Sequence, residues 1–145
     1  MDRYHNPEFT QVELYVAYKD YLWMMDLVEE MVEYVVMAVN EGDTKVQVGE
    51  HLIDFKRPWK RYTMYGAIQE FTGMDISGMN EEEVYKTARD LKVEVDETMG
   101  KGKLIDEIFG ETVEGKLIQT TYIMDYPIEM SPLAKKHREK EGLVE

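Results

Sequence analysis

The sequence predicts an α+β fold, with strands near both ends of the chain and helices grouped between them. Three observations support this class. Every second residue is apolar in the stretch 9–18, apolar residues recur at helical spacing from residue 21 onward, and the stretch TTYIMDYP at 120–127 has the composition of a strand. We expect a single domain, because 145 residues match the size of one.

The stretch 9–18 is expected to form the first strand. Side chains of a strand point alternately to its two faces. One face here is apolar and consists of Val12, Leu14, Val16 and Tyr18. The other face places the carboxylate of Glu13 between the aromatic rings of Phe9 and Tyr15.

Two interpretations of this second face remain open. A half-exposed strand with one face in water explains Glu13 without any binding role. A binding site explains it as well, because a carboxylate beside a phenol suits an ammonium group. The ring of Phe9 offers a flat surface on which a nucleobase can stack, and His5 and Asn6 add hydrogen-bonding groups next to it.

A long helix is expected to follow the strand, with Asp20 as its N-cap and Gly42 as its stop. Its carboxylates share one face and comprise Asp26, Glu29, Glu30 and Glu33. We interpret this face as solvated. A metal site is disfavoured, because helix-borne two-metal sites combine such carboxylates with a Glu-x-x-His spacing that is absent here.

The middle of the chain predicts a hairpin and three shorter helices. KVQVGEHLIDF at 45–55 has two alternating runs around a turn at Gly49 and Glu50. The helices are expected in TMYGAIQEFTG (63–73), NEEEVYKTARDLKV (80–93) and GKLIDEIFGETVEGKLI (102–118). Thr63 and Asn80 are the expected N-caps of the first two. The last strand ends at Pro127, and the polar stretch SPLAKKHREKEG after it is expected to be irregular or a short helix.

The composition excludes several classes of function. The net charge is −13, from 30 acidic and 17 basic residues, and nucleic-acid binding needs Lys and Arg against phosphates. The chain by itself is therefore a poor candidate for binding RNA or DNA, and we interpret the basic clusters at 56–61 and 135–140 as solvated surface. The absence of cysteine excludes disulfides and fits a reducing compartment. Without a long apolar run, the expected location is the cytoplasm, away from membranes.

The stretch HNPEFTQVELYVAYKDY at 5–21 resembles the second half of motif 2 of class II lysyl-tRNA synthetases. The resemblance continues through YTMYGAI, KLIDEIFGETVEGKLIQ and YPIEMSPLAKKHREKEGL, and covers essentially the whole chain. It implies part of the antiparallel-sheet core of a class II aminoacyl-tRNA synthetase, with an inserted helical subdomain. The motif 2 strand would be residues 1–19, the helix, hairpin and helical insert 20–119, and a strand with a polar tail 120–145.

The resemblance implies a role for each residue on the exposed face of the first strand. His5 and Asn6 would contact ATP, and Phe9 would stack on adenine. Glu13 would hold the ε-ammonium group of lysine, with Tyr15 beside it. The implied activity is that of a lysine–tRNA ligase, which activates lysine with ATP and transfers it to tRNA.

The resemblance also implies that part of the catalytic machinery lies outside these residues. The Phe-Arg-Asn-Glu-Gly segment of motif 2 is expected before Met1, and motif 3 and the glutamates that bind Mg²⁺ are expected after Glu145. We therefore expect this chain alone to hold no metal site and no complete catalytic set, to activate no lysine and to bind no tRNA. Its N-terminal strand is expected to self-associate, because unpaired strand edges recruit partners.

Two alternatives to a lysine–tRNA ligase stay open at this point. A related ligase that attaches lysine to a protein would share the catalytic core and lack the anticodon-binding domain. A truncated module without catalysis, with a structural or interaction role, would also account for the absent arginine and glutamates.

Overall fold

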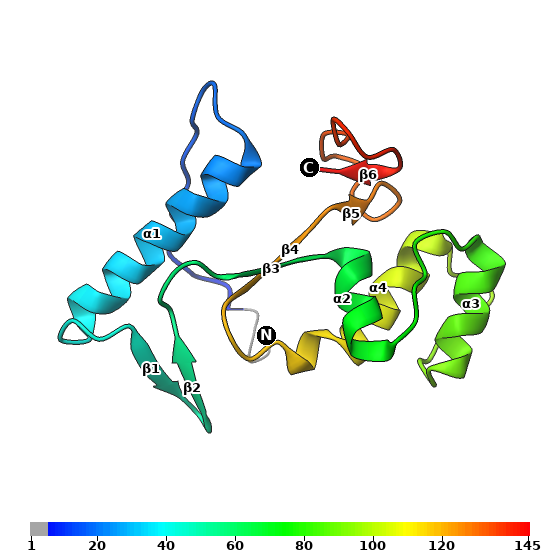
Figure 1. Cartoon of the computed structure of the whole chain (residues 1–145), viewed down its shortest axis with the longest axis horizontal. Coiled ribbons are helices and arrows are strands. Elements are labelled where there is room, and N and C mark those ends of the chain that lie inside the picture. The colour runs from blue at the N-terminus through cyan, green and yellow to red at the C-terminus, as the bar shows by residue number, and fades with distance from the viewer. Residues whose placement is uncertain (1–5) are drawn as a thin grey trace.

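The computed structural model of the chain describes residues 6–145 (Figure 1). A long helix and a hairpin lie at one end of the molecule, three helices lie at the other, and two strands run between them (Figure 1). The mixture of helices and small sheets agrees with the predicted α+β class.

The elements follow one another as α1 (Tyr21–Val39), β1 (Lys45–Val48), β2 (His51–Asp54), β3 (Lys60–Thr63), α2 (Met64–Thr72), α3 (Glu81–Asp90), α4 (Lys101–Thr112), the short 3₁₀ helix η1 (Glu114–Lys116), β4 (Thr121–Met124), β5 (Tyr126–Pro127) and β6 (Leu143–Val144). Strands β1 and β2 form the antiparallel hairpin that the sequence predicts. Strands β5 and β6 are also antiparallel, whereas β3 and β4 are parallel.

Local sequence explains where the helices begin and end. The side chain of Asp20 accepts a hydrogen bond from a backbone N–H of the first turn of α1, and Thr63 does the same for α2. Asn80 and Glu83 form a reciprocal capping box at the start of α3. Helix α2 ends at Gly73, whose φ of 77° is the left-handed conformation that glycine adopts without a steric cost.

The hydrophobic core lies among α2, α3 and α4. We call residues 64–117, which contain these helices and η1, the helical unit. Its fully buried large side chains are Met64, Ile68, Ile76, Val84, Leu104, Ile105, Ile108 and Val113. The helical unit therefore covers most of its own apolar surface. Side chains from outside the unit also pack against the same core, namely Tyr62, Ile123, Tyr126 and Met130.

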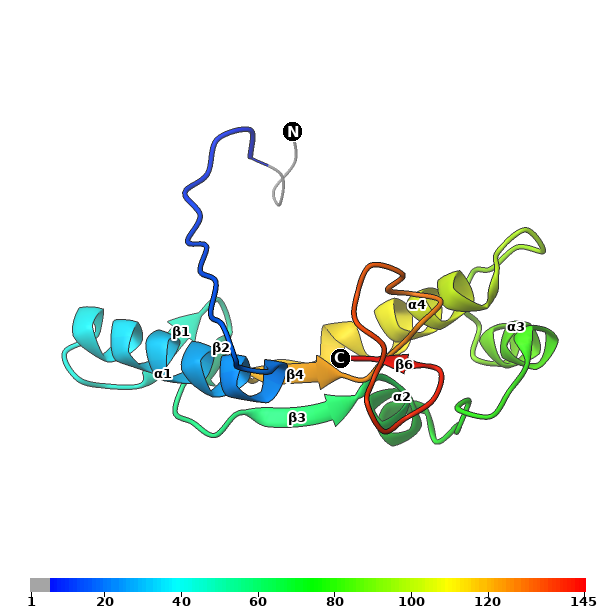
Figure 2. The same cartoon turned by 90° about the horizontal axis from the view of Figure 1, so that it is seen from above.

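Strands β3 and β4 connect the helical unit to the hairpin and α1 (Figures 1 and 2). In the β3–β4 pair, Lys60 lies opposite Thr121 and Thr63 opposite Met124. Strand β3 precedes the helical unit in the sequence and β4 follows it, so this pair closes the unit at its base. The side chain of Gln119 extends this connection to the hairpin. It accepts a hydrogen bond from the Asp54 backbone N–H at 3.0 Å and donates one to the carbonyl of β2 residue Leu52 at 3.0 Å.

The acidic face of α1 is solvated at Asp26 and Glu30, as expected, whereas Glu29 is buried, and all four carboxylates of this face pair with arginines. Arg61 on β3 contacts Asp26 at 2.6 Å and Glu29 at 3.1 Å, and the side chain of Glu29 is only 4% exposed. Arg57 pairs with the two carboxylates one turn further along α1. The basic cluster at 56–61 is exposed, as expected for solvated surface, and two of its members also form these ion pairs. Arg57 and Arg61 lie 24 to 35 positions after the carboxylates they contact, so the spacing within α1 could not reveal them.

The strand expected at 9–18 is not formed. Residues 6–19, which we call the N-terminal segment, lie outside the helices and strands and extend away from the rest of the molecule (Figure 2). The physical reason is that a strand needs a hydrogen-bonded neighbour, and none of the sheets formed by residues 6–145 includes this segment.

Among residues 6–145, no helix combines the length and the apolar character that crossing a lipid bilayer requires.

Candidate functional site

Glu13 and Tyr15 lie next to each other on the N-terminal segment. The Tyr15 hydroxyl donates a hydrogen bond to Glu13 Oε1 at 2.7 Å. This hydrogen bond raises the pKa of Tyr15, because the phenol gives up its proton less readily beside a carboxylate. The contact agrees with the alternation in the sequence, which places both side chains on one side of an extended chain.

Phe9 and Asn6 lie further back on the same segment, and both are exposed. The ring of Phe9 is 76% exposed and that of Tyr15 is 86% exposed. Within residues 6–145, no hydrogen bond or ring contact joins Phe9 or Asn6 to the Glu13–Tyr15 pair. The remaining sequence candidate, His5, lies outside the residues that the structure describes.

The Glu13–Tyr15 pair has the chemistry of a cation-binding group. Tyr15 uses one oxygen of the carboxylate, so Oε2 can accept a charge-assisted hydrogen bond from an ammonium donor. The phenol ring beside it can attract the same cation. Because the segment is exposed, the pair forms an open recognition surface rather than an enclosed pocket.

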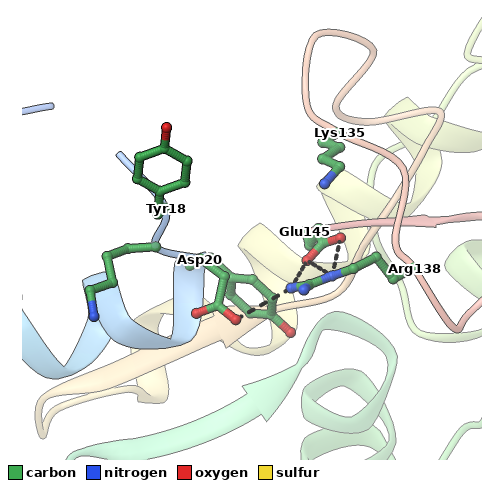
Figure 3. A pocket seen from close by; sticks show the side chains of 7 residues that line it. Tyr18, Asp20, Lys135, Arg138 and Glu145 are labelled. Atoms are coloured by element: carbon green, nitrogen blue, oxygen red, sulfur yellow. Dashed lines mark hydrogen bonds and ion pairs between the residues drawn. The ribbon is translucent and has the colours of Figure 1, made fainter. Parts of the chain in front are cut away.

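A cleft of about 450 Å³ lies at the base of the N-terminal segment, where it joins α1 (Figure 3). Its lining residues are Tyr18, Lys19, Asp20, Tyr21, Lys135, Arg138 and Glu145. The cleft therefore lies between the start of α1 and residues 135–145.

Arg138 bridges the two sides of this cleft (Figure 3). Its guanidinium contacts both carboxylate oxygens of Glu145, at 2.6 and 2.9 Å, and its Nη2 lies 3.4 Å from Asp20 Oδ2. Arg138 holds the pKa of Glu145 below its ordinary value. The pKa of Asp20 is lowered as well, first by the hydrogen bond from the Trp23 backbone N–H and then by Arg138.

The bridge by Arg138 was missed in the sequence, where residues 135–140 were interpreted as solvated surface. Asp20 and Arg138 are separated by 118 positions, so no local pattern connects them. The only feature of the sequence that points to this contact is charge, because Asp20 is negative and the cluster at 135–140 is positive.

The C-terminal stretch that carries Arg138 is folded back on itself by a buried carboxylate. Asp125, whose side chain is 1% exposed, pairs with Lys140 through Oδ2, and its Oδ1 lies 3.6 Å from His137 Nε2. His137 Nδ1 accepts hydrogen bonds from the backbone N–H groups of Glu139 and Lys140, at 3.0 and 3.1 Å. These contacts fix the turn from which Arg138 projects.

Comparison with known proteins identifies relatives along the entire chain. The family model described as tRNA synthetases class II (D, K and N) matches residues 1–145. The lysine–tRNA ligase of Christiangramia forsetii is 59% identical over 145 residues, and those of two Porphyromonas gingivalis strains are 61% identical. Each match covers 100% of this chain and 25% of the relative, so the chain spans a quarter of the length of these relatives.

Proposed function

The chain belongs to the class II tRNA synthetases of the D, K and N group, and on this premise we propose that it forms part of a lysine–tRNA ligase. Such an enzyme activates lysine with ATP and transfers the lysyl group to tRNA. The three relatives described above are named lysine–tRNA ligases and match the whole chain. These matches give no support to the alternative in which lysine is attached to a protein.

The observation that carries the proposal is the Glu13–Tyr15 pair on the same segment as Phe9. In the proposed site, Glu13 accepts the ε-ammonium of lysine and Tyr15 holds the carboxylate in place through its 2.7 Å hydrogen bond. Phe9 provides the surface on which adenine stacks. Asn6 and His5, which precede Phe9, supply the further contacts to ATP.

The reaction proposed for the complete enzyme is in-line attack of the lysine carboxylate on the α-phosphate of ATP. The residues of this chain would bind and orient the two substrates, and orientation alone can lower such a barrier by several kcal/mol (about 7–11). Mg²⁺, when bound, would stabilise charge on the phosphates. No three His, Asp or Glu side chains of residues 6–145 come together as a metal-binding group. The resemblance to lysyl-tRNA synthetases supports the proposal that the carboxylates that bind Mg²⁺ lie in other parts of the complete enzyme.

The same proposal covers partners and location. The partners of the complete protein would be lysine, ATP and tRNA, and a role in translation places it in the cytoplasm. With a net charge of −13, this part of the protein would contribute little to tRNA binding. Taken alone, the chain is proposed to self-associate through the N-terminal segment.

The assignment of Glu13 can be tested in a chimaera in which residues 1–145 replace the matching quarter of the P. gingivalis lysine–tRNA ligase. In lysine-dependent ATP–pyrophosphate exchange, Glu13→Gln should lower kcat/KM for lysine on the order of 100-fold or more. The reason is that the pair of Glu13 and the ε-ammonium would be desolvated once the rest of the enzyme covers this exposed segment, and the substitution removes one partner of that pair. KM for ATP should change little. Phe9→Ala should show the reverse, with ATP affected more than lysine.

Glu50→Gln is the matched control, because it makes the same change at an exposed turn of the hairpin. It should leave both substrates unaffected. An unchanged KM and kcat for lysine in Glu13→Gln would show that Glu13 does not bind the ε-ammonium. The 145-residue chain alone should give no measurable exchange, since each missing charge-stabilising donor costs about 10²–10³ in rate.

A further inference from the structure

We propose that Arg138 is a positioning residue, which fixes the direction in which the N-terminal segment leaves α1. The inference rests on the proposed function in one respect, namely that this segment carries the contacts to lysine and ATP. The role of Arg138 in holding the segment is a separate claim with its own measurement.

The junction between the N-terminal segment and α1 is held at Asp20 by both carboxylate oxygens. Oδ1 accepts a hydrogen bond from the Trp23 backbone N–H at 3.1 Å, and Oδ2 faces Arg138 Nη2 at 3.4 Å (Figure 3). Two residues earlier, Tyr18 has a φ of 60°, so the backbone changes direction at this point. Arg138 therefore contacts the helix N-cap, two residues after the turn at Tyr18, and so holds the point at which this turn joins α1.

Arg138 is itself held in place by the folded C-terminal stretch. Its two-oxygen contact with Glu145 has the geometry that makes arginine–carboxylate pairs directional, and the side chain of Glu145 is only 6% exposed. The turn that carries Arg138 is held by contacts among Asp125, His137 and Lys140. Arg138 can therefore act as a fixed support rather than as a freely moving surface side chain.

A small change at Asp20 has a large effect at Glu13. An extended chain rises about 3.4 Å per residue, so Glu13 lies up to roughly 24 Å along the segment from Asp20. A rotation of about 5° at the junction would then move Glu13 by roughly 2 Å, and displacements of about 1 Å can reduce catalysis substantially. Arg138 would thus influence how lysine and ATP are placed without touching either of them.

The first test is the fluorescence anisotropy decay of a probe attached at Ala17→Cys, the only cysteine in the labelled chain. It requires no enzymatic activity and is measured at nanomolar concentration, below the range in which a dimer is expected. Arg138→Gln should increase the nanosecond mobility of this probe, while a probe on an exposed position of the helical unit stays unchanged. Asp20→Asn keeps an N-cap oxygen and removes the charge, so it should give the same result. The double variant should add nothing further, because both changes remove one contact.

Lys136→Gln is the matched control, since it removes one positive charge from the same exposed stretch. In the chimaera, Arg138→Gln should reduce kcat/KM for lysine about two- to fivefold, the range expected for a partly exposed ion pair. Arg138→Lys should restore part of this loss, and Lys136→Gln should have no effect.

The outcomes separate the two claims. If the mobility of the probe at residue 17 in Arg138→Gln matches that in Lys136→Gln, Arg138 does not position the segment, whatever the activity shows. If Arg138→Gln mobilises the segment and Glu13→Gln leaves lysine use unchanged, the positioning role stands and the assignment of Glu13 fails. If mobility changes and kcat/KM does not, the link from Arg138 to substrate placement is wrong.

Discussion

The helical unit and the region before it differ in what covers their apolar side chains. In the helical unit the large apolar residues of α2, α3 and α4 are fully buried against one another. In α1, which is longer than any of these helices, the buried residues are Met25 and Glu29. Tyr34 and Val39 on α1 are 73% and 80% exposed, and Phe9 and Val12 on the N-terminal segment are equally open.

This difference shows that an amphipathic pattern predicts a helix and says nothing about whether its apolar face is covered. Helix α1 forms because its residues have helical spacing and Asp20 caps its first turn. Its apolar face finds no comparable partner within residues 6–145. On the proposed function, the remaining three quarters of a full-length synthetase would supply that partner.

The largest expected effect is dimerisation, in which a second copy of the chain covers the exposed N-terminal segment and so removes its difference from the buried helical unit. We expect the isolated chain to self-associate through this segment, because it offers unpaired backbone groups and an apolar face. Sedimentation equilibrium at micromolar concentration should show a dimer, which requires an association free energy of about 8 kcal/mol or more in magnitude. A monomer whose residues 9–18 are protected from amide exchange would show instead that the segment pairs within its own chain.

The next largest effect is on stability, and it compares a leucine-to-alanine substitution in the helical unit with the same substitution on α1. Leu104→Ala should reduce the free energy of unfolding by about 2–5 kcal/mol, because it leaves a cavity in the core of the helical unit. Leu22→Ala, at a half-exposed position of α1, should cost less than about 1 kcal/mol. Urea unfolding followed by circular dichroism measures both. Equal losses would mean that α1 is packed as tightly as α4.

A smaller effect concerns the close contact of α4 with the C-terminal stretch. A Cβ at Gly102 would lie 2.7 Å from the carbonyl oxygen of Glu129 and 2.9 Å from its carbonyl carbon. Gly102→Ala should therefore destabilise the chain by about 1–3 kcal/mol, in spite of the better helix propensity of alanine.

Gly110→Ala on the same helix serves as the control. There the nearest atom would be Glu114 Oε2 at 3.9 Å, so alanine should stabilise by up to about 1 kcal/mol. Thermal unfolding of both variants should give melting temperatures that move in opposite directions. A rise for Gly102→Ala would show that the backbone at Glu129 can move away from α4 at little cost.

The smallest effect is the pH dependence of the bridge formed by Arg138. Because the pKa of Glu145 is lowered in the folded chain, its stabilising contribution is present above the ordinary glutamate pKa and is lost as the pH falls through the folded value. The pKa of Asp20 is lowered as well, so the stabilising contribution of Asp20 is also lost on acidification. The difference in melting temperature between the wild type and Arg138→Gln should therefore disappear on acidification from neutral pH. A difference that grows at low pH would contradict this linkage, and Lys136→Gln should show no pH-dependent difference.

Elements whose determinants are close together in the sequence were predicted well. The N-caps at Thr63 and Asn80, the stop at Gly73 and the hairpin turn all depend on residues within a few positions of one another. Strand β3 was not predicted, because KRYT is short and polar and its partner β4 lies beyond the helical unit. Long-range pairing overrides local composition in such cases.

The same distinction applies to the candidate site. The proximity of Glu13 and Tyr15 follows from the alternation of an extended chain and was predicted. The strand itself was not formed, since strand pairing depends on neighbours that the alternation cannot supply. Two contacts could not be predicted from sequence spacing, namely that of Arg61 with the acidic face of α1 and that of Arg138 with Asp20. Each joins residues more than 30 positions apart.

The parallel pair β3–β4 has a consequence for the order in which the chain folds. The two strands enclose the whole helical unit, and Gln119 reaches back 67 positions to Leu52. Closing so long a loop carries an entropic cost that contacts made early in folding do not offset. The helical unit can form first from contacts within its own stretch, and its compact core then brings the ends of the loop together. Strands β3 and β4 should therefore join late, and the hairpin should be the last element to be fastened to the rest.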